Sequence, residues 1–142
     1  MGGGKKSAWV VLGSALVVLV GCVSTQGTLT SSAERLERNA AELARDGRDS
    51  TRYANDAREL ADRAHDFRLT VTDRRADDRD IRLAFEELSH DYHSLRDEVD
   101  RSESTDALAD FRDVTEAYLD IEREMNGRYG RVAGDRDDRA RF

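Results

Sequence analysis

Two histidines and a glutamate close together in the sequence are the side chains best suited to binding a metal ion. Glu87 and His90 stand three residues apart, the spacing that places two ligands on one helical face in di-iron bundles. Such a centre needs a second copy of this pair and two further glutamates, and the sequence has one copy. His90 and His93 could hold a zinc ion together, but a structural zinc site takes four ligands. We therefore expect no resident metal, with Glu87, His90 and His93 as the nearest candidate ligands.

Paired carboxylates are the other groups that could do acid–base chemistry, and they occur at Asp77-Asp78 and Glu86-Glu87. A catalytic acid needs a shifted pKa, which burial in apolar surroundings usually supplies. No apolar pocket is evident around either pair, and arginines recur among the acids at helical spacing. These patterns predict a charged, solvated helix surface on a protein that is not an enzyme.

The single cysteine, Cys22, directly follows a short apolar segment near the start of the chain. Lys5 and Lys6 give the segment a positively charged beginning, and a run of thirteen mostly apolar residues follows from Ala8 to Val20. A membrane-crossing helix needs about 20 apolar residues, so this run is too short to span a bilayer. Its length and its charged start are typical of a secretory signal peptide.

The end of the run, Leu19-Val20-Gly21-Cys22, resembles the lipobox of bacterial lipoproteins. The resemblance implies a diacylglycerol on the Cys22 sulfur, cleavage between Gly21 and Cys22, and an N-acyl chain on the new amino terminus. Two or three acyl chains hold a protein stably to a bilayer. Val23 stands where an aspartate often marks retention at the inner membrane, so the resemblance implies the outer membrane, with the chain facing the periplasm.

Apolar and small residues recur along the rest of the chain at alternating intervals of three and four, the heptad pattern of packed helices. The pattern predicts an all-α fold, an antiparallel helical bundle or coiled coil of three long helices, or of four if Gly47 breaks the first. The first helix is expected over about 31–72, with turns near 72–80 and 100–105. The main heptad positions are Leu36, Ala40, Leu43, Gly47, Ser50, Ala54, Ala57, Ala61, Ala64 and Val71, then Ile81, Phe85, Leu88, Tyr92, Leu95 and Val99, then Ala107, Phe111, Val114, Tyr118, Ile121 and Met125.

Local signals divide the chain into four parts. Ser31 and Glu34 have the spacing of a capping box, in which each side chain accepts a hydrogen bond from a free backbone N–H, so the first helix is expected to begin there. Ser104 has the character of a helix cap before the last helix. The predicted parts are a signal peptide at 1–21, a lipidated tether at 22–30, a helical bundle at 31–133 and a disordered charged tail at 134–142.

The unequal helix lengths raise the question of what covers the first helix. If it is continuous, it is nearly twice as long as the other two, and its first half projects without a partner in its own chain. Leu36, Ala40 and Leu43, which we term the association seam, would then bind a second copy or another protein. Replacing Leu43 by Asp should abolish that association and leave the bundle folded. A four-helix bundle would instead cover these residues within the chain.

The overall charge limits the classes of partner that the chain could bind. Lys plus Arg number 23 against 30 Asp plus Glu, a net charge of −7, which argues against nucleic acid. We predict a lipid-anchored, non-enzymatic component of the bacterial envelope that works by protein interaction, as an adaptor or a structural part. The alternatives are a periplasmic sensor of metal or envelope stress acting through His65, His90 and His93, and an immunity lipoprotein that neutralises a toxin.

Overall fold

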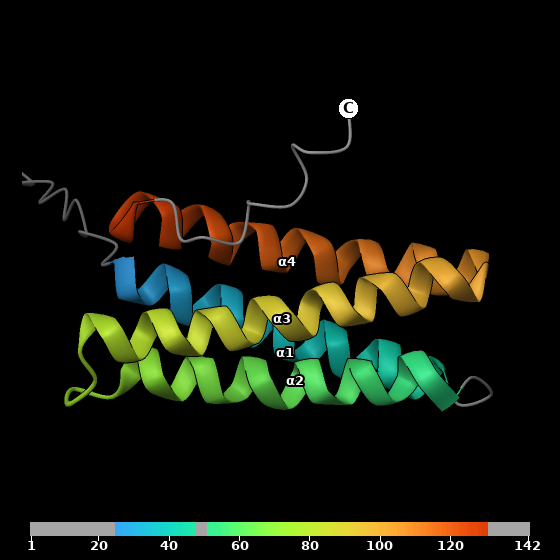
Figure 1. The fold of residues 1–142 in the computed structure, drawn as a ribbon, viewed down its shortest axis with the longest axis horizontal. Coiled ribbons are helices and arrows are strands. Elements are labelled where there is room, and N and C mark those ends of the chain that lie inside the picture. The colour runs from blue at the N-terminus through green and yellow to red at the C-terminus, as the bar shows by residue number, and fades with distance from the viewer. Residues whose placement is uncertain (1–24, 48–50, 131–142) are drawn as a thin grey trace, which may run out of the picture.

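The chain folds into four helices in a computed structural model that describes residues 25–47 and 51–130. Successive helices are antiparallel and lie side by side as a bundle (Figure 1). The expected all-α bundle is confirmed, and its four-helix form is the correct one. The helices are α1 (Thr25–Asp46), α2 (Thr51–Thr72), α3 (Asp78–Ser102) and α4 (Thr105–Tyr129).

The heptad positions form the core, as predicted. Every expected position of α3 and α4 is buried, from Ile81 to Val99 and from Ala107 to Met125. The described positions of α1 and α2 are buried as well, and Tyr53, Leu60 and Phe67 widen the apolar face of α2. The charged residues between these positions stay on the surface, so hydrophobic burial alone explains which face of each helix turns inward.

Gly47 directly follows the last residue of α1, and an aromatic ring occupies the space that a side chain would need there. The Gly47 N–H still donates to the carbonyl oxygen of Leu43 at 3.0 Å. A Cβ atom at position 47 would lie 2.4 Å from a ring carbon of Tyr53, which is the third residue of α2. The absent side chain therefore allows the start of α2 to pack closely against the end of α1.

We expect Gly47→Ala to lower the free energy of unfolding by about 1–3 kcal/mol, because the added methyl group must displace the Tyr53 ring. Gly127→Ala is the matched control, since a Cβ there meets nothing within 4 Å and the exposed residue lies inside α4. Alanine is the better helix former by up to about 1 kcal/mol, so the control should be neutral or stabilising. Chemical denaturation measures both, and equal effects would contradict the proposed role of the Tyr53 ring.

The predicted association seam is wrong, because Leu36, Ala40 and Leu43 are no more than 1% exposed. α1 lies between α2 and α4 and packs against both. Since the four helices have nearly equal lengths, 22 or 25 residues, no half-helix projects beyond its neighbours. The apolar face of α1 is therefore satisfied within the chain.

The start of the bundle also differs from the prediction. α1 begins at Thr25, and Leu29 is fully buried, so residues 25–30 belong to the bundle and are not a tether. Ser31 consequently lies inside the helix and does not cap it. Burial of Leu29 explains the extension, since packing outweighs the modest helix preference of the threonines around it. The predicted signal peptide and tail fall outside the described residues.

The caps of the last two helices are well defined. Asp77 caps α3: its side chain accepts from the N–H groups of Arg79 and Asp80, and the Asp80 side chain accepts from the Asp77 N–H. This reciprocal arrangement is a capping box. The predicted cap at Ser104 is confirmed, because its hydroxyl accepts from the Ala107 N–H at 3.3 Å.

Side-chain size sets the spacing of the helices. Alanines make up half of the buried apolar residues of α1 and α2, which approach each other closely. Of the four pairs of adjacent helices, α3 and α4 have the fewest close backbone approaches. Large rings fill the space between α3 and α4. The rings of Tyr92 and Tyr118 are stacked, with centroids 3.8 Å apart, and Tyr118 donates a hydrogen bond to the Ser89 hydroxyl at 2.9 Å.

Burial raises the pKa of Tyr118 from its ordinary value of 10.0 to about 12. The unfolded chain therefore loses this proton at a lower pH than the folded chain does. Stability from Tyr118 is complete below pH 10 and declines as the pH rises to about 12. We expect the free energy of unfolding to fall by about 1.4 kcal/mol per pH unit in this range. Denaturation curves across this range should show the slope, and Tyr118→Phe should make it shallower, with the remainder due in part to Tyr129, whose pKa burial also raises. An unchanged slope in the variant would contradict the assignment.

Candidate functional site

The three candidate metal ligands, Glu87, His90 and His93, do not form a metal site together in the structure. Glu87 accepts a hydrogen bond from Arg63 at 2.8 Å, and His90 is exposed on α3. His93 is half-buried, with its ring edge-on to Tyr92 at 5.3 Å between centroids. Among the described residues, no three His, Cys, Asp or Glu side chains form a group that could hold a metal ion.

A groove of about 480 Å³ lies between α1 and α2, and we term it the α1–α2 groove. Ala44 and Ala61 are almost fully buried and Ala41 is half-buried, so the alanines form the floor. The charged residues of the lining are exposed and form the rim. They are Arg45, Arg58 and Asp62.

The arginines at the rim are positioned by local hydrogen bonds. Arg45 donates through Nε to the carbonyl oxygen of Ala41 at 3.2 Å, and Arg58 donates through Nη1 to Asn55 Oδ1 at 2.7 Å. Within residues 25–47 and 51–130, neither guanidinium forms an ion pair with a carboxylate. Their positive charge is therefore available to an acidic group from outside the described residues.

Two arginines at other helix interfaces are paired with acids. Arg35 of α1 binds Asp120 of α4, and this hydrogen bond holds the pKa of Asp120 below its usual range. Arg63 of α2 binds Asp91 of α3 at 3.0 Å, and that hydrogen bond raises the arginine pKa. These ion pairs join neighbouring helices, whereas Arg45 and Arg58 at the rim of the α1–α2 groove form no ion pair within the described residues.

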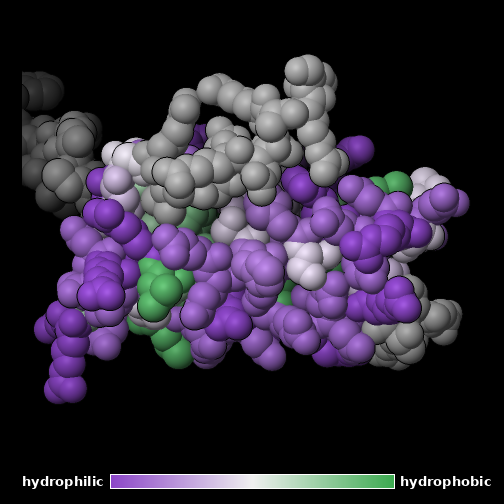
Figure 2. Space-filling model, in the orientation of Figure 1, coloured by the Kyte–Doolittle hydropathy of each residue, from purple (hydrophilic) through white to green (hydrophobic). Residues whose placement is uncertain are grey.

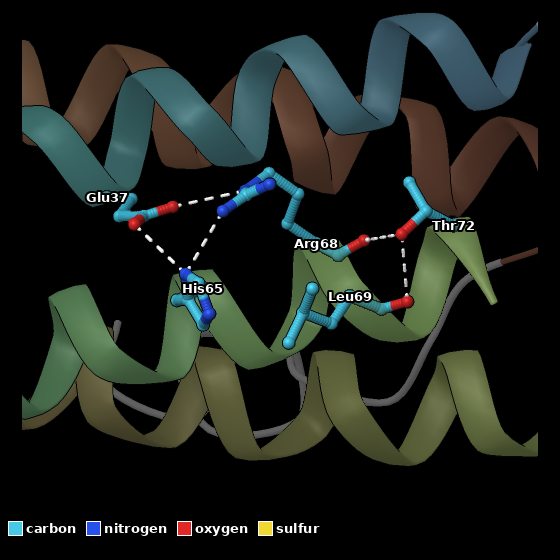
Figure 3. A network of polar contacts seen from close by, with 5 residues as sticks. All are labelled: Glu37, His65, Arg68, Leu69 and Thr72. Atoms are coloured by element: carbon cyan, nitrogen blue, oxygen red, sulfur yellow. Dashed lines mark hydrogen bonds and ion pairs between the residues drawn. The ribbon is translucent and has the colours of Figure 1, made fainter.

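A polar network lies on the same pair of helices, formed by Glu37 of α1 with His65 and Arg68 of α2 (Figure 3). Arg68 Nε donates to Glu37 Oε2 at 3.1 Å, and the other carboxylate oxygen lies 3.1 Å from His65 Nδ1. Arg68 Nη2 lies 3.0 Å from the same Nδ1. The backbone of Arg68 is fixed in turn, since the Thr72 hydroxyl donates to its carbonyl oxygen at 3.0 Å.

The two contacts of His65 Nδ1 exclude each other. Arginine has donors only and a carboxylate accepts only, so Nδ1 must be unprotonated to accept from Arg68 and protonated to donate to Glu37. The network therefore has two hydrogen-bonding states, selected by the proton on one ring nitrogen. Either state keeps the Arg68–Glu37 pair between α1 and α2.

We expect neutral His65 to carry its proton on Nε2, with Nδ1 accepting from Arg68. Replacing Arg68 by Met removes that donor, so the proton should move to Nδ1 and be donated to Glu37. Nitrogen-15 NMR of the imidazole ring distinguishes the two tautomers, and Arg58→Met on the same helix is the control. The same tautomer in all three chains would contradict this description of the network.

The lipidation and cleavage residues, Cys22 and Gly21, lie outside the described residues. The structure does show where the described chain begins: the first residue of α1, Thr25, is three positions after Cys22. None of the described helices is both long enough and apolar enough to cross a membrane.

No protein-family model matches this chain, and neither the curated proteins nor the solved structures contain a significant match. The features that bear on function are therefore those of the chain itself. The α1–α2 groove was not predicted from the sequence. Its signal was the occurrence of Ala41 and Ala44 directly after the heptad positions Ala40 and Leu43, with Arg45 next in the sequence.

Proposed function

We propose that this chain is a non-enzymatic lipoprotein of the bacterial cell envelope, anchored by acyl chains on Cys22 and facing the periplasm from the outer membrane. The lipobox residues support the anchor. The position of Cys22, three residues before the first turn of a complete helical bundle, supports the same arrangement. In this arrangement the lipid holds the protein to the bilayer and the bundle is left to bind a partner.

The partner surface that the geometry favours is the α1–α2 groove, in place of the buried association seam. An alanine floor lets a third helix approach closely, because small side chains keep the distance between backbones short. Arg45 and Arg58 at the rim carry positive charge without a carboxylate partner in the described chain. The occupant we propose is an acidic helix of another envelope protein, which would supply those carboxylates.

The anchor is tested by the mass of the intact chain purified from a bacterial membrane. We expect a chain that begins at Cys22 and carries diacylglycerol and N-acyl groups, because a thiol is the nucleophile that the lipobox presents. Cys22→Ala should remove the added mass and prevent cleavage after Gly21. An unmodified thiol in the wild-type chain would overturn the anchor.

The groove is tested by photocrosslinking in intact envelopes, with a photoreactive amino acid in place of exposed Asp62. We expect one discrete adduct, because the rim lies within reach of a bound helix. Ala41→Trp fills the groove and should reduce the adduct at least about tenfold, which corresponds to a loss of roughly 1.4 kcal/mol of binding. Ala109→Trp, on an exposed face of α4, should leave it unchanged.

Two results would contradict the proposal that the α1–α2 groove binds an acidic helix of another protein. An adduct unaffected by Ala41→Trp would place the partner elsewhere on the bundle. An adduct with the mass of two copies of this chain would show that the groove binds a second copy and not an acidic helix of another protein.

A further inference from the structure

One end of the bundle combines exposed leucines with arginines that have no carboxylate partner among residues 25–47 and 51–130. The first residue of α1, the turn between α2 and α3, and the last residue of α4 lie together at this end (Figure 1). Leu69 of α2 is 50% exposed and Leu83 of α3 is 56% exposed. These are the two largest values among the exposed large apolar side chains of the described residues. Single exposed leucines are normal on a protein surface, so what matters is whether the two lie together.

The two leucines lie at the same level of the bundle. α2 and α3 are antiparallel, and the rings of Phe67 and Phe85 meet with centroids 6.3 Å apart. Two residues further along α2 and two residues back along α3 are Leu69 and Leu83. Figure 2 shows hydrophobic surface near this end of the α2–α3 face, surrounded by hydrophilic surface.

In the adjoining turn, three of the acidic side chains accept hydrogen bonds from the backbone, whereas two of the arginines form no ion pair within the described residues. Asp73, Asp77 and Asp80 each accept a hydrogen bond from a backbone N–H, so these carboxylates are engaged in the turn and the cap. Arg74 and Arg75 are exposed, and within the described part of the chain neither forms an ion pair. Asp78, the first residue of α3, follows the same turn, and Arg75 shares a pocket with Asp73 and Asp80. A guanidinium group matches the geometry of a phosphate, which is the basis for the contact proposed below.

We propose that this end of the bundle lies against the membrane, with Leu69 and Leu83 in the headgroup region of the leaflet that holds the acyl chains. The inference rests on the proposed lipid anchor. From Cys22 to Thr25 an extended chain reaches at most about 10 Å, so the anchor keeps this end close to the lipid. No longer tether is available to carry the bundle away from it.

Leu83 lies close to the end of the bundle that the anchor would hold near the lipid. Leu83 is five residues after the first residue of α3, roughly 7.5 Å along the helix axis. Apolar side chains of interfacial helices enter the boundary between headgroups and acyl chains by about 5–10 Å. A tilt of the bundle toward its α2–α3 face would bring both leucines to that depth and the arginines of the turn to the phosphates.

The test uses the full chain, purified with its acyl groups and placed in vesicles of phosphatidylethanolamine and phosphatidylglycerol with brominated acyl chains. Leu69→Cys, Leu83→Cys and Leu108→Cys are labelled separately with a thiol-reactive fluorophore, which cannot react with an acylated Cys22. Leu108 is the matched control, because it is 44% exposed and lies at the opposite end, near the start of α4. Bromine quenches the fluorophore on contact with the acyl-chain region.

We expect quenching at positions 69 and 83 to exceed quenching at position 108 by at least about twofold, as interfacial burial predicts. Equal quenching at the three positions of an acylated chain would overturn the membrane contact and leave the anchor standing. A chain whose mass lacks acyl groups would overturn the anchor and, with it, this inference. Quenching at 69 and 83 that persists after Arg74→Glu and Arg75→Glu would assign the contact to the leucines alone and overturn the phosphate contact.

Discussion

Burial of one face of α1 is the constraint on which the rest of the structure depends. Leu36, Ala40 and Leu43 are covered by α2 on one side and by α4 on the other. This arrangement requires the chain to reverse at the end of α1, where Gly47 accommodates the Tyr53 ring. The reversal yields four helices of nearly equal length, so each has partners along its whole length and the bundle closes within a single chain.

The unequal sizes of the core residues then determine what the surface offers. Alanines let α1 and α2 approach closely, and the same small residues leave the α1–α2 groove open on the outside. Aromatic rings between α3 and α4 separate those helices and fill the interior. The groove is thus a consequence of close packing, and the two arginines of its rim form no ion pair within the described residues.

Periodicity predicted which residues are buried better than it predicted where helices end. The heptad spacing passes through Gly47 to Ala54 without a shift, so the pattern alone could not show that the chain reverses there. The steric reason lies in the Tyr53 ring, which only the folded structure places against Gly47. The same limit explains residues 25–30, whose polar character concealed the burial of Leu29, and the groove, which depends on which alanines of α1 and α2 meet. The resemblance of Leu19-Val20-Gly21-Cys22 to a lipobox, by contrast, rests on a local motif, and it stays a prediction because these residues lie outside the described part of the chain.

The most direct test of the closed four-helix bundle is the free energy of unfolding of the Leu43→Asp chain, measured by chemical denaturation. Leu43 is 1% exposed, so a carboxylate there would be buried without a partner, at a penalty of several kcal/mol. A small protein is stable by only about 5–15 kcal/mol, and we therefore predict loss of most or all of the cooperative transition. An unfolding free energy equal to that of the wild-type chain would mean that Leu43 faces outward, and would contradict the bundle described above.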